Sequence, residues 1–139
     1  MDDKDKINSR IRFWWVLREK LFQEDNKIKM NLSSPSKDYS FVVIPFLEIF
    51  DIEFNIQFRE NNIIRLAIQT KDENIHNFLV DKQKDFSEKL NEYMDYPDRK
   101  KFKQLYMEKN MDLNNSNEKE ETLKWITENI LKIRKIFLK

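Results

Sequence analysis

The stretch DIEFNIQFRENNIIRLAIQTK, residues 51–71, decides the fold, because apolar and polar residues alternate along both of its halves. Alternation with a period of two is typical of β-strands, whose successive side chains point to opposite faces of a sheet. Pairing Phe58 with Ile64 puts the apolar residues of both predicted strands on one face of the sheet. It leaves a short loop at residues 60–62, where asparagine supplies the turn. The stretch therefore predicts an antiparallel hairpin.

The segments before this hairpin predict a helix, a connection and a strand. Apolar residues recur at helical spacing over residues 4–22, which indicates an amphipathic helix. Residues 24–38 are polar and contain turn formers, so they predict a connection. Residues 39–50 are almost continuously apolar and predict a buried strand, kinked at Pro45 because proline cannot donate to a strand ladder.

The segment after the hairpin predicts a long second helix. Thr70 and Glu73 have the spacing of a capping box, in which two side chains satisfy the first free amide groups of a helix. Apolar residues then keep helical spacing to about residue 94.

The remaining third of the chain predicts strand and then helix. Residues 99–113 are rich in lysine and predict one or two short strands. Residues 114–117 predict a turn and helix cap, and apolar residues at steps of three and four predict a third helix that ends near Phe137. We therefore expect a single α+β domain over residues 1–139, in the order α-β-β-β-α-β(β)-α, with a mainly antiparallel sheet packed by three helices.

Composition excludes several classes of function. The 26 basic and 25 acidic residues leave a formal net charge of +1, so no global field attracts nucleic acid. With no cysteine and one histidine, the chain cannot form disulfides, thiolate zinc sites or Cys-His pairs. Glycine is absent, which excludes glycine-rich phosphate loops. The charged N-terminus and the lack of a long apolar run predict a cytoplasmic protein without a membrane span.

One end of the predicted hairpin gathers four polar side chains. The pairing register places Asp51 opposite Lys71 and Glu53 opposite Gln69, on the face turned away from the apolar set. This order of elements, with an acid on one strand and acid-x-Lys on the next, resembles PD-(D/E)xK nucleases, in which carboxylates hold magnesium and the lysine assists water attack.

Two interpretations of these four residues stay open. A magnesium-dependent nuclease would use Asp51, Glu53, Gln69 and Lys71, although Gln69 stands where such enzymes have a carboxylate, and an amide binds magnesium more weakly. The alternative is an exposed cross-strand ion pair between Asp51 and Lys71, which we favour because motifs this short recur by chance. No cofactor is expected, except Mg²⁺ under the nuclease alternative.

Two basic groups are candidates for nucleic-acid binding. They comprise Arg99, Lys100, Lys101, Lys103, Lys132, Arg134 and Lys135. The first group is interleaved with Phe102 and Tyr106, so cations could follow phosphates while aromatic rings stack on bases. The alternative is a solvated strand face and a helix end whose cations suit the helix dipole.

The single histidine and two tryptophans have weaker functional signals. His76 has no companion ligand in the sequence and predicts a structural role. Trp15 and Trp125 lie off the main apolar stripes of their helices, so either one would pack at an interface if the protein formed a homo-oligomer.

Three segments resemble the domain of unknown function 4268 family. These are Phe13-Trp14, the strand IIRLAIQT with the following helix over residues 78–90, and TLKWITENILKIRKIF near the C-terminus. The family comprises small bacterial and archaeal domains, found alone or C-terminal to larger proteins, some with nuclease-like regions. The resemblance implies a bacterial defence or nucleic-acid-processing setting, but no agreed activity and no catalytic residue.

Together these observations predict a non-enzymatic interaction module that binds a protein or nucleic-acid partner. The divergent or degenerate magnesium-dependent nuclease and the small homo-oligomeric structural protein remain the two alternatives.

Overall fold

The computed structural model describes residues 3–31, 38–90 and 103–137 of the chain. In chain order the elements are α1 (Asp3–Glu24), β1 (Lys29–Asn31), β2 (Tyr39–Val43), α2 (Pro45–Glu48), β3 (Ile52–Arg59), β4 (Ile63–Thr70), α3 (Glu73–Asp81), α4 (Gln83–Leu90), β5 (Lys103–Asn110) and α5 (Ser116–Phe137). The α+β class, with helices packed on an antiparallel sheet, is confirmed.

The five strands form one antiparallel sheet in the order β1-β2-β3-β4-β5, so each strand pairs with its neighbour in the chain. The hairpin of β3 and β4 has the predicted register, with Phe58 opposite Ile64 and Glu53 opposite Gln69. Its loop is closed by Asn61 and Asn62, which have φ angles of 62° and 56°. Asparagine tolerates this left-handed region better than most residues, which explains how a chain without glycine makes the turn.

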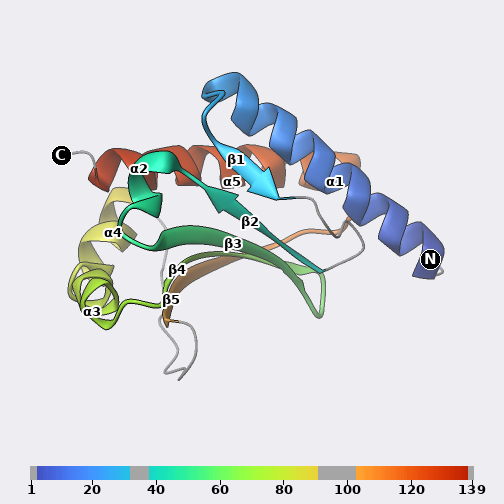
Figure 1. Ribbon diagram of the computed structural model, residues 1–139. Coiled ribbons are helices and arrows are strands. Elements are labelled where there is room, and N and C mark those ends of the chain that lie inside the picture. Colours follow the sequence, from blue (N-terminus) through green and yellow to red (C-terminus); the bar gives the residue numbers. More distant parts are fainter. Residues whose placement is uncertain (1–2, 32–37, 91–102, 138–139) are drawn as a thin grey trace.

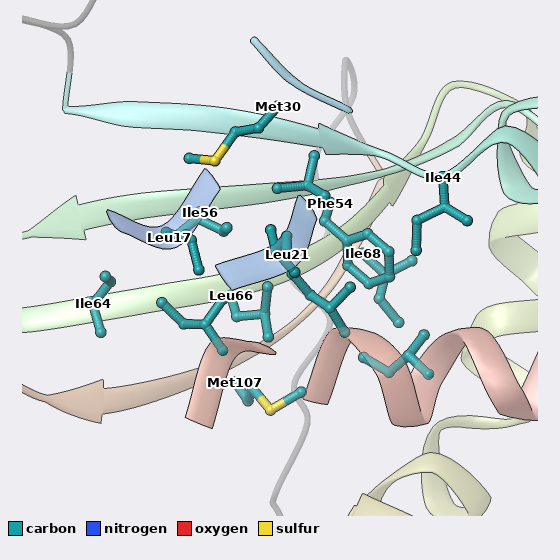
Figure 2. Close-up of a cluster of buried hydrophobic side chains, with 14 of the residues drawn as sticks. Leu17, Leu21, Met30, Ile44, Phe54, Ile56, Ile64, Leu66, Ile68 and Met107 are labelled. Carbon is teal, nitrogen blue, oxygen red and sulfur yellow. The ribbon is translucent and has the colours of Figure 1, made fainter. Parts of the chain in front are cut away.

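The hydrophobic core lies on one face of the sheet, beneath α1 and α5. Figure 1 shows both long helices on the same side of the curved sheet, and Figure 2 shows side chains from α1 meeting those of β3 and β4. Every second residue of β3 from Ile52 to Phe58 is buried there, as the alternating sequence requires. Trp14 of α1 packs on Phe58 with ring centroids 4.9 Å apart, and Phe13 meets the same ring at 5.4 Å.

The two long helices are also joined at the surface. A guanidinium nitrogen of Arg134 in α5 lies 2.7 Å from Asp25, the residue that follows α1. The carboxylate of Asp25 also accepts a hydrogen bond from the backbone N–H of Lys27 at 2.9 Å. This hydrogen bond, followed by the charge of Arg134, holds the pKa of Asp25 below its ordinary value of 3.8.

Two predictions for the segment before the hairpin were wrong. The predicted connection contains β1, a three-residue strand paired with β2. The predicted kinked strand ends at Val43, because Pro45 begins the short helix α2. Proline at the first position of a helix loses no intrahelical hydrogen bond, since that N–H would be unpaired in any case.

The second helix begins later than predicted and is divided in two. Thr70 is the last residue of β4, and its hydroxyl accepts a hydrogen bond from the N–H of Asp72. The cap is Asp72, whose carboxylate accepts from the N–H of Ile75 at 3.0 Å. Lys82 then separates α3 from α4, with backbone angles of −96° and 2°. The predicted third helix is confirmed, with Asn115 capping α5 by accepting from the N–H of Glu118.

Candidate functional site: the outer face of the sheet

The sheet has a second face, turned away from α1 and α5, which we call the outer face. It carries the residues of β2 to β5 that alternate with the core residues, and directly paired residues share a face. The register therefore arranges the outer face in rows across the strands. One row, of Arg59, Ile63 and Asn110, lies at the loop end of the hairpin, and three further rows make up the candidate site. These three rows are Tyr39, Gln57, Arg65 and Glu108; Phe41, Asn55, Ala67 and Tyr106; and Glu53, Gln69 and Gln104.

The first row contains an arginine, Arg65, that contacts both a carboxylate and an aromatic ring. Arg65 Nε and Nη2 both lie 2.9 Å from the same carboxylate oxygen of Glu108. The guanidinium carbon of Arg65 also lies 3.8 Å from the ring centroid of Tyr106, in the next row. These contacts fix the planar guanidinium against the ring, so the side chain is rigid although it is charged.

The third row is a chain of hydrogen-bonded amides. Gln104 Nε2 donates to Gln69 Oε1 at 2.8 Å, and Gln69 Nε2 donates to Glu53 Oε1 at 2.7 Å. Asn55 Nδ2, from the second row, donates to the same oxygen of Gln69 at 3.2 Å. Gln69 is only 2% exposed, so these bonds satisfy a buried amide that would otherwise destabilise the fold.

The second row begins and ends with an aromatic side chain, Phe41 on β2 and Tyr106 on β5. Phe41 and Tyr39 on β2 meet edge to face with centroids 5.4 Å apart, and both are half-buried. Tyr106 lies at the other end of the row, and the small side chain of Ala67 separates it from Asn55. Beside the first row, a shallow cavity of about 460 Å³ is lined partly by Gln57, Arg59, Arg65 and Glu108.

Of the four residues of the nuclease alternative, Glu53 and Gln69 are paired in the hairpin as predicted, whereas Asp51 and Lys71 lie just beyond the ends of β3 and β4. Glu53 and Gln69 are paired directly, and Asp51 Oδ2 accepts a hydrogen bond from the backbone N–H of Lys71 at 3.1 Å. Asp51 has a φ angle of 56°, so it belongs to the turn between α2 and β3. Within residues 3–31, 38–90 and 103–137, no group of three or more His, Asp or Glu side chains is arranged to hold a metal ion.

The described members of the two basic groups belong to β5 and α5. Arg99, Lys100 and Lys101 lie outside the described residues, so the prediction for them stays a prediction, and Lys103 begins β5. Lys132 and Lys135 are exposed on α5, whereas Arg134 is half-buried against Asp25. Because α5 packs on the core face, its cations lie on the opposite side of the sheet from Tyr106.

The other three candidate residues have different surroundings. His76 is half-buried in the first turn of α3, where its backbone N–H donates to the carbonyl of Asp72. Trp125 packs partly against the core, whereas Trp15 is 52% exposed on α1.

Sequence reasoning missed the outer face as a unit. The alternation of IEFNIQF does place Glu53, Asn55 and Gln57 on one face, and this signal was present in the hairpin. The contributions of Tyr39, Phe41 and Gln104 depend on pairings between strands that are not joined by a short loop, so alternation alone could not align them.

None of the described helices has the length and apolar character needed to cross a bilayer.

Comparison of the chain with known proteins found no relative. No protein-family model, no curated protein and no solved structure matches the chain.

Proposed function

We propose that this protein is a non-enzymatic interaction module that binds a macromolecular partner on the outer face of its sheet. The observation that carries the proposal is the arrangement of that face. Partly exposed aromatic and polar side chains lie beside buried Arg65, Gln69 and Gln104, whose contacts hold the face together; the partly exposed set is Tyr39, Phe41, Asn55, Gln57 and Tyr106. Side chains held by packing and hydrogen bonds lose little entropy when a partner binds.

The composition of the face supports a protein partner. Interface cores are enriched in tyrosine, phenylalanine and arginine and are depleted of lysine and aspartate. The outer-face positions of the five strands carry three cations, Lys29, Arg59 and Arg65, and two glutamates, Glu53 and Glu108. This balance favours a protein over a polyanion, which needs a net positive surface. A nucleic-acid partner would depend on the predicted basic run that precedes β5.

The nuclease alternative has less support from the site. In a magnesium site the oxygens of Glu53 and Gln69 would face the metal, whereas here the amide nitrogen of Gln69 donates to Glu53 and its oxygen accepts from Gln104. Asp51 bonds the backbone of Lys71, which suits a residue that closes a turn. The proposed setting in bacterial defence or nucleic-acid processing rests on the family resemblance alone.

The first test uses labelled single- and double-stranded DNA and RNA, with magnesium or EDTA. Purified protein is compared with Phe41→Ser on the outer face and with Phe22→Ser, which removes an exposed ring from α1. A salt-sensitive mobility shift weakened only by Phe41→Ser would identify nucleic acid as the partner. Magnesium-dependent cleavage that Lys71→Ala abolishes would overturn the proposal and support the nuclease.

The second test addresses a protein partner directly. A photoreactive amino acid replaces Phe41 in one variant and exposed Lys132 on α5 in another, and each variant is cross-linked in the cells of origin. We expect a defined cross-linked protein from the Phe41 position that is absent from the Lys132 position. If neither test gives a product specific to the outer face, the proposal is wrong.

A further inference from the structure

The central strand β3 carries opposite charges at the two ends of its outer face. Arg59 is exposed beside the hairpin loop, and Glu53 is half-buried six residues earlier on the same face. Arg59 therefore lies one row beyond the first row of the outer face, whereas Glu53 belongs to the third row. The two charges are placed symmetrically about the middle of β3, which is at Ile56.

The rows between these charges are matched with one another along each strand. The first-row and second-row residues are both aromatic on β2 and both amides on β3, and on β4 a large side chain is followed by a small one. An amide both donates and accepts hydrogen bonds, so two amides suit each other. The pairs are Tyr39 and Phe41, Gln57 and Asn55, and Arg65 and Ala67.

We infer that the partner of the outer face is a second copy of this chain, packed face to face against the first. The inference rests on the proposed function, because it names the partner of the same surface. A twofold axis between the two sheets, parallel to the rows and level with Ile56, keeps each strand over the same strand of the copy and reverses its direction. The first row of each copy then faces the second row of the other, so no outer-face residue faces its own counterpart.

This packing brings opposite charges together twice. Arg59 of each copy faces Glu53 of the other copy. Gln69 donates to Oε1 of Glu53, which leaves Oε2 as an acceptor for the arginine. Face-to-face sheets pack at about −30°, an angle that keeps this register on the central strands.

The sizes of the side chains agree with the same arrangement. The long side chain of Arg65 faces the small Ala67 of the other copy, and Gln57 faces Asn55. One symmetry operation thus matches charge, size and hydrogen-bonding groups, which is the self-complementarity that an isologous dimer requires.

The expected interface is small. The patch extends about 20 Å along β3 from Glu53 to Arg59 and about 14 Å from β2 to β5. Such a patch falls at the low end of specific interfaces. The monomer–dimer equilibrium should therefore respond to protein concentration in the micromolar range and above.

The first test is sedimentation velocity over a range of concentrations at low ionic strength, where charge pairs are least screened. Arg59→Glu places like charges opposite one another twice and should weaken the dimer by about tenfold or more. Arg59→Lys keeps the charge and should retain most of the affinity. Arg18→Glu makes the same change of charge at an exposed position of α1 and should leave the dimer constant unchanged.

The second test locates the twofold axis by cross-linking. The chain has no cysteine, so single cysteines can be introduced without background. A short thiol cross-linker should join Arg59→Cys protein to Glu53→Cys protein when the two are mixed. Each variant alone should cross-link poorly, because the axis places identical positions at opposite ends of the patch. The sedimentation series leaves Glu53 intact, so it stands if Glu53→Cys proves unstable.

The outcomes separate this inference from the proposed function. A protein that stays monomeric at every concentration would overturn the inference. The proposed function would survive that result if the photoreactive group at Phe41 captured a different protein, and would fail with it if nothing were captured. A dimer indifferent to Arg59→Glu, or one that cross-links equally well in the single-variant samples, would place the interface elsewhere and also overturn the inference.

Discussion

Gln69 shows how a single residue type separates two interpretations of the same site. It occupies the strand position at which a carboxylate would complete an acid-x-Lys pattern with Lys71. An ionised carboxylate only accepts hydrogen bonds, whereas an amide both donates and accepts. Gln69 uses both capacities, because its nitrogen donates to Glu53 and its oxygen accepts from Gln104. The amide therefore connects three strands of the outer face.

Gln69→Glu should destabilise the protein at neutral pH by about 1–3 kcal/mol, because it buries a second carboxylate beside Glu53. One carboxylate of such a pair has a folded-state pKa above the unfolded value of about 4.3. The variant should therefore regain stability as the pH falls toward that value and lose it as the pH rises. Urea unfolding of both proteins across this pH range measures the effect.

The matched control for this variant exchanges the two groups. Glu53→Gln combined with Gln69→Glu leaves one carboxylate and one amide in the pair, so most of the neutral-pH loss should disappear. A double variant as unstable as Gln69→Glu would show that repulsion between carboxylates is not the cause.

Asp25 should contribute to stability in a pH-dependent way. Its pKa is held below 3.8 in the folded protein by the N–H of Lys27 and by Arg134, so folding favours the ionised form. This contribution is present above pH 3.8 and is lost as the pH falls through the lower folded value. Asp25→Asn should therefore be less stable than the parent protein at about pH 7, and the difference should shrink as the pH falls below 3.8. A difference in urea unfolding that stays constant across this pH range would contradict this expectation.

At the scale of elements, the β3–β4 hairpin depends on two asparagines in the left-handed region. Asn62 has a φ of 56°, which a β-branched side chain strongly disfavours. Asn62→Val should lower the free energy of unfolding by about 1–2 kcal/mol, whereas Asn62→Gly should cost little. Thermal or urea unfolding provides the measurement. Asn26→Val, in a turn without positive φ, is the control and should have the smaller effect.

The predictability of each element follows from the length of its pattern. The hairpin and α5 were predicted because alternation or helical spacing continues over many residues. β1 was missed because three residues are too few to show a period, and its pairing with β2 is a tertiary contact. The start of α3 was misplaced because Thr70 and Asp72 are both suitable cap residues, and the end of β4 decides between them.

At the scale of the molecule, the two faces of the sheet should respond differently to truncation. Phe54 is fully buried on the core face, and Phe54→Ala should cost about 3–5 kcal/mol, enough to unfold much of a marginally stable domain. Phe41 is half-buried on the outer face, and Phe41→Ala should cost less than half as much. Urea unfolding of the two variants distinguishes them, and equal losses would mean that the outer face belongs to a second core.

The fold class could be predicted because one hairpin and two amphipathic helices leave few arrangements of a small domain. The outer face could not, because its rows depend on how β2 and β5 align with the hairpin. Arg65 and Glu108, for instance, are 43 residues apart, and no local pattern indicates that they pair.

The strand order has a consequence for how the chain folds. Every strand pairs with its neighbour along the chain, so the sheet can assemble by short-range steps. The two long helices instead meet across almost the whole chain, since Asp25 and Arg134 are 109 residues apart. Because α1 and the sheet are synthesised before α5, the part of their shared core that α5 covers stays exposed until α5 docks. Docking of α5 should then be the late step of folding, and the nascent chain before that step is the species that chaperones would bind.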